Sequence, residues 1–195
     1  MKTLGSYFIQ FIARPLRVAE RMAGDPDGVW AGFWCAFLFL LAYSLTVLIY
    51  YLLGHQPMAP GFLPISREKW YLVQTFTTIP IGLGGFISYA GLAHLLGKAW
   101  GGTGSFESTF GAQMFANVIP CALFIAPFFI AAGAKALPWP DWVDTLRVFV
   151  IPLPWIFALS VLSLSKTQRI SWLKALLIVP VSWIPLAGIM AVFIR

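Results

Sequence analysis

Charged residues are scarce in this sequence of 195 residues. Aspartate and glutamate total 7, lysine and arginine total 13, and charged residues make up only 10% of the chain, whereas hydrophobic residues make up 59%. A soluble domain carries about 25% charged and about 45–50% apolar residues. A water-soluble chain of this length could not cover so much apolar surface in one core. The composition therefore excludes an ordinary soluble domain and predicts an integral membrane protein.

Residues that hold metals or catalyse reactions are also few. The two cysteines, Cys35 and Cys121, lie inside apolar runs without a CxxC pattern, which favours packing over a disulfide or a metal site. The two histidines, His55 and His94, have no Cys, Asp or Glu at ligand or triad spacing. Glu107 could pair with His94 across a turn, but helix capping is the commoner use of such a residue. We therefore predict no enzyme, no metal site and no cofactor.

Long apolar segments fill most of the chain. About 20 residues, rising about 1.5 Å each, suffice for a helix to cross the hydrocarbon layer of a bilayer. We predict an all-α bundle of five transmembrane helices in a domain over residues 29–195, with spans at about 30–53, 71–96, 111–134, 148–164 and 172–194. Prolines inside several spans predict kinked helices: Pro80, Pro152, Pro154, Pro180 and Pro185.

Residues 1–28 form an N-terminal arm with an amphipathic pattern. Three arginines, Arg14, Arg17 and Arg21, recur with Gln10 on one helical face, opposite Phe8, Ile12, Leu16, Ala19 and Ala23. The pattern predicts an interfacial helix, broken or restarted at Pro15, whose arginines contact anionic lipid headgroups. A topology-setting cytoplasmic arm is the preferred interpretation, and a sensor of lipid or of a partner is the alternative. The net charge of +6 lies in this arm and in short loops, which disfavours nucleic acid as a partner.

A glycine-rich polar connector at residues 100–110 separates the second and third apolar segments. Ser105 is a predicted N-cap for the third span, with Glu107 in the first turn. Backbone amides there could bind phosphate, but the run lacks the Gly-Lys-Ser/Thr ending of a P-loop. A tight interhelical turn is the preferred interpretation, and its motif residues are Gly101, Gly102, Gly104, Ser105, Phe106 and Thr109.

Polar residues inside spans two and three form a candidate intramembrane face: Ser88, His94, Gln113 and Asn117. Amides at such depth normally face protein rather than lipid. Packing between helices is the preferred interpretation, and part of a substrate path is the alternative. Gly84, Ser88 and Gly91 also share one face, which would let a neighbouring helix approach closely.

Basic residues are distributed unevenly between the two sides of the predicted bundle. Eight of the 13 lie in the arm and in the loops on its side, and five lie on the other side. Because cytoplasmic loops carry the excess of lysine and arginine, this bias predicts a cytoplasmic N-terminus and a C-terminus outside.

The connector and its flanks carry a family pattern. The second apolar segment ends in His94-Leu95-Leu96, the turn reads Gly101-Gly102-Thr103-Gly104-Ser105-Phe106, and Thr109-Phe110 follows. Over about residues 10–190 the chain resembles the Yip1 domain family of membrane proteins, whose members have about five spans. Eukaryotic members act in vesicle trafficking with small GTPases. The chain lacks the Asp-Leu-x-Gly-Pro-like signature of those members and is more similar to a small prokaryotic member of the bacterial inner membrane.

These observations predict a non-enzymatic membrane scaffold or adaptor that organises membrane proteins or lipids. Its partners would be membrane lipids, further copies of itself or other membrane proteins. The alternative is an oligomeric channel, transporter or lipid-translocating protein that uses the polar face of spans two and three. Coupled transporters usually carry ionisable residues deep in the membrane, and the apolar segments carry none away from their ends.

Overall fold

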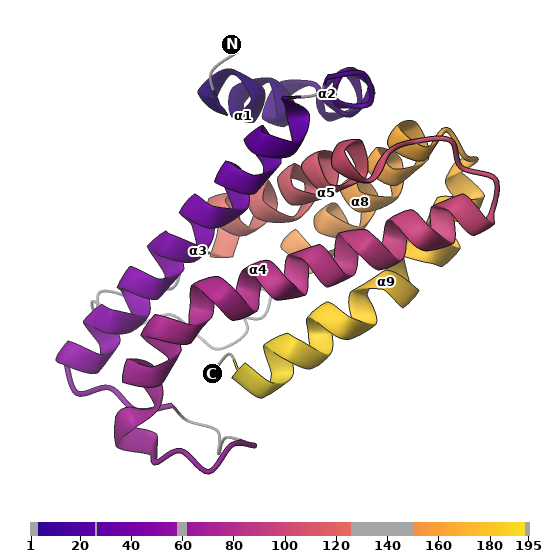
Figure 1. The fold of residues 1–195 in the computed structure, drawn as a ribbon. Helices are drawn as coiled ribbons and strands as arrows, with labels where there is room; N and C mark the ends of the chain where they lie inside the picture. The colour runs from indigo at the N-terminus through magenta and orange to yellow at the C-terminus, as the bar shows by residue number, and fades with distance from the viewer. Residues whose placement is uncertain (1–3, 26, 58–61, 126–149, 194–195) are drawn as a thin grey trace.

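The computed structural model describes residues 4–25, 27–57, 62–125 and 150–193, which form helices and no strand (Figure 1). The helices are α1 (Leu4–Ala13), α2 (Pro15–Met22), α3 (Gly28–Leu52), α4 (Arg67–Ala99), α5 (Phe106–Pro120), the π-helical turn η1 (Cys121–Ile125), α8 (Pro152–Gln168) and α9 (Trp172–Phe193). The predicted all-helical class is confirmed for these residues.

Three of these helices, α3, α4 and α9, are long and apolar enough to cross a membrane. They correspond to the first, second and fifth predicted spans. The third predicted span begins inside α5 and runs on to residue 134, and the fourth begins at residue 148, so both extend beyond the described residues. Five crossings therefore stay a prediction.

The prolines take different places in the helices. Pro152 begins α8, where its missing N–H costs no hydrogen bond. Pro80 lies inside α4, and Pro180 and Pro185 lie inside α9. Pro120 ends α5 and is followed directly by the π-helical turn η1. The kinks predicted at the internal prolines stay predictions.

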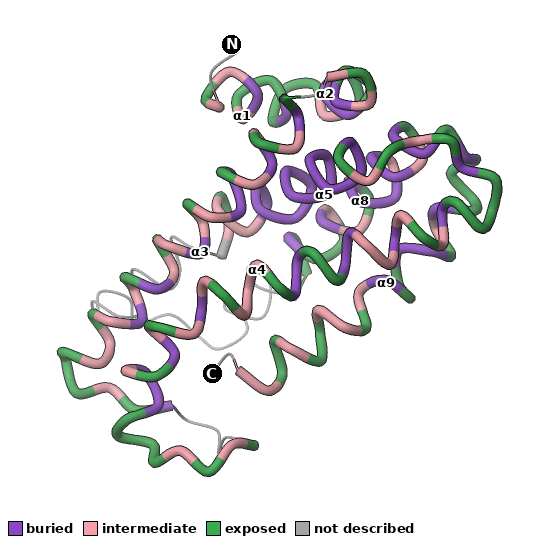
Figure 2. Tube along the Cα trace, viewed as in Figure 1, coloured by how far each residue is buried: buried purple, intermediate pink, exposed green. Residues whose placement is uncertain are grey.

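Helix α5 lies at the centre of the bundle (Figure 2). Every residue from Ser108 to Pro120 is buried, and α5 contacts α1, α2, α3, α4 and α8. A helix that is apolar on all sides is stable only when other helices surround it. Small residues bring the backbones of α3 and α5 together, because a Cβ on Gly32 would lie 2.5 Å from the Cα of Gly111.

The small-residue stripe of α4 does not make such a contact within the described residues. No atom lies within 4 Å of a Cβ built on Gly84 or Gly91, and Ser88 is exposed. The stripe therefore faces out of the bundle, and the close helix approach occurs on α3 and α5 instead.

The arm packs against the bundle. Phe11 stacks on Phe115 of α5 with ring centroids 5.7 Å apart, and Tyr7 approaches the same ring at 6.3 Å. The helix is interrupted at Arg14, and Pro15 is the first residue of α2. The buried residues of the two helices recur at the spacing of a single helical face. Tyr7, Phe11, Val18 and Met22 form this buried face, whereas Ile12 and Leu16 of the predicted apolar face are exposed and Ala19 is buried.

Candidate functional site

The glycine-rich connector between α4 and α5 packs against the end of α8. The amide of Thr103 donates to the carbonyl oxygen of Gln168 at 2.9 Å. A Cβ on Gly104 would lie 2.0 Å from the carbonyl oxygen of Thr167, and a Cβ on Gly102 would lie 2.6 Å from Oε1 of Gln168. Glycine is therefore required at residue 104 by the backbone of α8, and at residue 102 by the carbonyl oxygen of Gly97 in α4, which would lie 2.7 Å from a Cβ.

The remaining turn residues have local roles. Gly101 has a φ of +90°, a left-handed conformation that favours glycine. Oγ of Ser105 accepts a hydrogen bond from the amide of Ser108 at 3.2 Å, which makes Ser105 the N-cap of α5. The hydroxyl of Thr109 donates to the carbonyl oxygen of Ser105 at 2.9 Å. Together these contacts fix the start of α5.

Gln168 at the end of α8 connects three helices. Its Nε2 lies 2.9 Å from Nδ1 of His94 on α4 and donates to Oγ1 of Thr109 on α5 at 2.6 Å. The ring of Phe106 meets that of His94 edge-on, with centroids 6.0 Å apart. The sequence assigns Phe106 and Thr109 to the turn and His94 to the intramembrane polar face, and it does not indicate Gln168. We call this junction of the α4–α5 connector with the end of α8 the clasp.

The turn after α8 leads into α9, whose first turn also holds the connector. Arg169 ends α8 with a φ of 57°, and Nζ of Lys174 donates to the carbonyl oxygen of Trp100 at 2.8 Å. The two helical hairpins, α4–α5 and α8–α9, are thus joined at the same end of the bundle (Figure 1).

Gln113 forms a second polar junction, deeper in the bundle. The hydroxyl of Tyr89 on α4 donates to Oε1 of Gln113 at 2.5 Å, and Nε2 of Gln113 donates to the carbonyl oxygen of Ser160 on α8 at 2.9 Å. Nδ2 of Asn117 donates to the backbone oxygen of Gln113 at 2.8 Å and lies 3.5 Å from Oγ of Ser160. Gln113 therefore connects α4, α5 and α8.

The predicted intramembrane polar face is divided in the structure. Gln113 and Asn117 lie together in the interior, His94 belongs to the clasp, and Ser88 is exposed on α4. The structure thus does not bring Ser88 to the other three residues. The reason is that the inward face of α4 holds Phe86, Tyr89, Ala90 and Ala93, and Ser88 lies outside that face.

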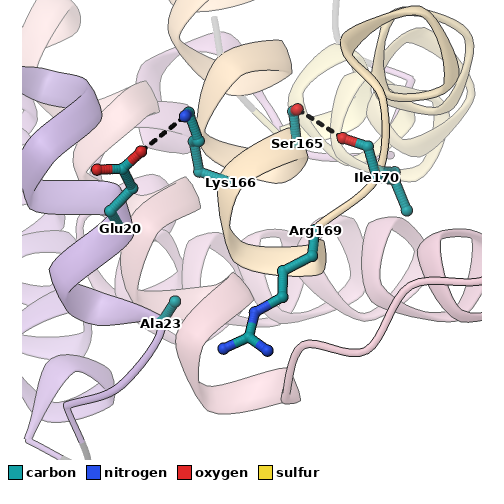
Figure 3. Close-up of a pocket in the computed structure, with 6 residues that line it drawn as sticks. All are labelled: Glu20, Ala23, Ser165, Lys166, Arg169 and Ile170. Carbon is teal, nitrogen blue, oxygen red and sulfur yellow. Dashed lines mark hydrogen bonds and ion pairs between the residues drawn. The ribbon is translucent and has the colours of Figure 1, made fainter.

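An ion pair joins the arm to the clasp end of the bundle. Nζ of Lys166 on α8 lies 2.6 Å from a carboxylate oxygen of Glu20 on α2. The pair borders a surface cavity of about 410 Å³ that is also lined by Ser165 and Arg169. Figure 3 shows the Lys166 side chain directed toward Glu20, whereas the Arg169 side chain points away from that pair.

A hydrogen bond fixes the first helix of the arm to the turn before α3. The hydroxyl of Tyr7 donates to Oδ2 of Asp25, and the amide of Asp27 donates to Oδ1 of Asp25 at 3.0 Å. These bonds, that from Tyr7 above all, hold the pKa of the Asp25 carboxyl below its usual range. Burial, followed by the bond to Asp25, raises the pKa of Tyr7 to about 12.

The three arginines predicted to contact lipid all line one groove on the arm. It has a volume of about 420 Å³ and also includes Ile9, Gln10, Ala13 and Val18.

In the part of the chain that the structure describes, no three His, Cys, Asp or Glu side chains are placed to hold a metal ion.

The helical fold and the three helices that could cross a bilayer define a helical membrane protein. A comparison with protein families matches the Yip1 domain over residues 9–194, and the chain belongs to this family. The match begins within α1, so the family domain includes most of the arm. Neither the curated proteins nor the solved structures give a match.

Proposed function

We propose that this Yip1 domain protein is a non-enzymatic membrane scaffold. It would cross the bacterial inner membrane five times, with the N-terminus in the cytoplasm and the C-terminus outside. Its outer helix faces would bind other membrane proteins or further copies of the chain, and its arm would contact anionic lipids. The alternative, a channel, transporter or lipid-translocating protein, would need the interior polar groups for its substrate.

The observation that carries the proposal is the hydrogen bonding of Gln113. Its amide oxygen and nitrogen both bond to neighbouring helices, and Asn117 bonds to its backbone. Hydrogen bonds between membrane helices stabilise their association by about 0.6–2 kcal/mol each. The interior polar groups therefore serve helix packing, which leaves the outside of the bundle for recognition.

The outside of α4 has the character of a helix-packing surface. Gly84, Ser88 and Gly91 lie on it without a neighbour among the described residues, beside large exposed apolar side chains such as Ile87 and Leu95. Small residues on a membrane helix allow a second helix to approach closely. This surface supports a role in binding a membrane-embedded partner.

The ends of the bundle support the proposed orientation. The described basic residues at the clasp end are Arg14, Arg17, Arg21, Lys98, Lys166, Arg169 and Lys174, whereas Arg67 and Lys69 lie at the opposite end of α4. Figure 1 shows α1, α2, the start of α3 and the two hairpin turns toward the same end. By the positive-inside rule this end faces the cytoplasm.

Photo-crosslinking in native membranes tests the scaffold. A crosslinking residue placed at Ser88 is expected to capture the same membrane protein, or a second copy of the chain, in repeated preparations. The same residue at the exposed Leu45 of α3, where no small-residue stripe lies, should capture lipid alone. Lipid alone at both positions would contradict the proposal.

A further inference from the structure

A groove on the arm combines a basic wall with an apolar one. It lies between α1 and α2, has a volume of about 420 Å³, and is lined by Ile9, Gln10, Arg14, Arg17, Val18 and Arg21 among others. Ile9 is 68% exposed and Val18 is buried, so apolar surface extends from the rim to the floor. Volumes of about 300–1,000 Å³ are typical of small-ligand sites.

Two of the three guanidinium groups lack a carboxylate partner within the described ranges. Glu20, the acid in α2, pairs instead with Lys166 of α8. Asp25 accepts a hydrogen bond from the hydroxyl of Tyr7, and its carboxylate also attracts the positive charge of Arg21. Arg14 and Arg17 are therefore left with uncompensated positive charge.

The walls of the groove are held in place before any ligand binds. Nη1 of Arg21 on α2 donates to Oε1 of Gln10 on α1 at 3.2 Å, which connects the two walls. Phe11 of α1 stacks on Phe115, and Met22 of α2 is fully buried. A preformed site loses less freedom on binding and therefore binds more tightly.

The chemistry of the groove fits a phosphate ester attached to an apolar chain. A guanidinium group offers paired N–H donors that match phosphate oxygens. The apolar residues Ile9 and Ala13 line the groove with the arginines and are exposed, where a soluble phosphate would gain nothing from them. Exposed Trp30 on the first turn of α3 marks the interfacial level just after the arm.

We propose that this groove is a specific site for one anionic phospholipid. Arg14 and Arg17 bind its phosphate, Arg21 positions Gln10 and closes the groove, and an acyl chain lies along Ile9 and Ala13. The proposal rests on the proposed function only in placing the arm at the cytoplasmic membrane surface. It goes further by replacing a general attraction to the surface with a single site.

Native mass spectrometry of the full chain in detergent, with added phosphatidylglycerol or phosphatidylcholine, tests the site. The wild type is expected to retain one phosphatidylglycerol and to retain phosphatidylcholine much less. Because each basic residue contributes roughly fivefold to binding an anionic lipid, the double variant R14Q/R17Q should bind about thirtyfold more weakly. The matched control R67Q/K69Q removes two charges at the opposite end and should bind as the wild type does.

Three results would overturn the site: equal loss of lipid in both double variants, equal retention of the two lipids, or displacement of the lipid by millimolar inorganic phosphate. If R14Q/R17Q melts well below the wild type, R14K/R17K keeps the charges without the guanidinium donors and should bind between the two. The crosslink from Ser88 is scored separately in R14Q/R17Q. If this variant loses the lipid but keeps the crosslink pattern, binding of the lipid and binding of the membrane partner are independent of each other.

Discussion

The carbonyl oxygen of Gln168 accepts a hydrogen bond from the backbone amide of Thr103 at 2.9 Å, and this bond joins the α4–α5 connector to the end of α8. The side chain of the same glutamine reaches His94 and Thr109. One residue thus connects two helical hairpins through both its backbone and its side chain. The stability of the bundle should therefore depend strongly on the clasp.

Gly104→Ala should destabilise the protein. The added Cβ would lie 2.0 Å from the carbonyl oxygen of Thr167, which is backbone and cannot move aside without shifting α8. Overpacking of this kind costs about 1–3 kcal/mol or more. The measurement is the thermal melting temperature in detergent.

The matched control is Gly84→Ala, where nothing lies within 4 Å of the new Cβ. Alanine in an exposed helix position is more stable than glycine by about 0.5–1 kcal/mol, so this variant should melt at or above the wild-type temperature. Similar melting of the two variants would show that α8 does not pack on the connector.

Gln168→Leu should also lower the melting temperature. It removes the hydrogen bond to Thr109 and the contact with His94, each of which contributes about 0.5–1.5 kcal/mol. Gln56→Leu changes an exposed glutamine outside the helices and serves as the control. A wild-type melting temperature for Gln168→Leu would show that this side chain does not stabilise the clasp.

Acid should weaken the attachment of α1. A carboxyl whose pKa is lowered in the folded state stabilises the fold above its unfolded pKa of about 3.9. The pKa of Asp25 is lowered, so this stabilisation is lost as the pH falls through the folded value. The melting temperature of the wild type should therefore fall between about pH 5 and pH 2.

The variant Tyr7→Phe tests the cause of this pH dependence. It removes the main donor to Asp25, so the dependence on pH should be shallower than in the wild type. Asp27→Asn keeps the backbone amide that bonds to Asp25 and should keep the wild-type slope. If the melting temperature of Tyr7→Phe depends on pH as steeply as that of the wild type, other carboxyl groups cause the loss of stability in acid.

Features set by neighbouring residues could be predicted from the sequence. The all-helical class, the position of the connector, the Ser105 cap and the restart of the helix at Pro15 all depend on short-range patterns. Gln168 could not be predicted, because its partners His94 and Thr109 are 74 and 59 residues away in the chain. Its only local signal is a polar residue at the end of an apolar segment, close to a basic turn.

The arm and the polar face show a second limit. The predicted apolar face includes Ile12 and Leu16, which are exposed, whereas the face that packs on the bundle holds Tyr7, Phe11, Val18 and Met22. Polar composition places Ser88 with Gln113, but Ser88 is exposed on α4, whereas Gln113 of α5 is bonded in the interior. The packing of the helices decides both points, and the sequence alone does not show it.

Flux through reconstituted protein tests the scaffold account most directly. Liposomes containing the wild type, Gln113→Leu or Asn117→Leu are compared for solute release and for lipid scrambling. We predict no flux above empty liposomes for all three, with a lower melting temperature for Gln113→Leu because its contacts with Tyr89 and Ser160 are lost. Flux in the wild type that Gln113→Leu or Asn117→Leu abolishes would contradict the account and establish a transport path.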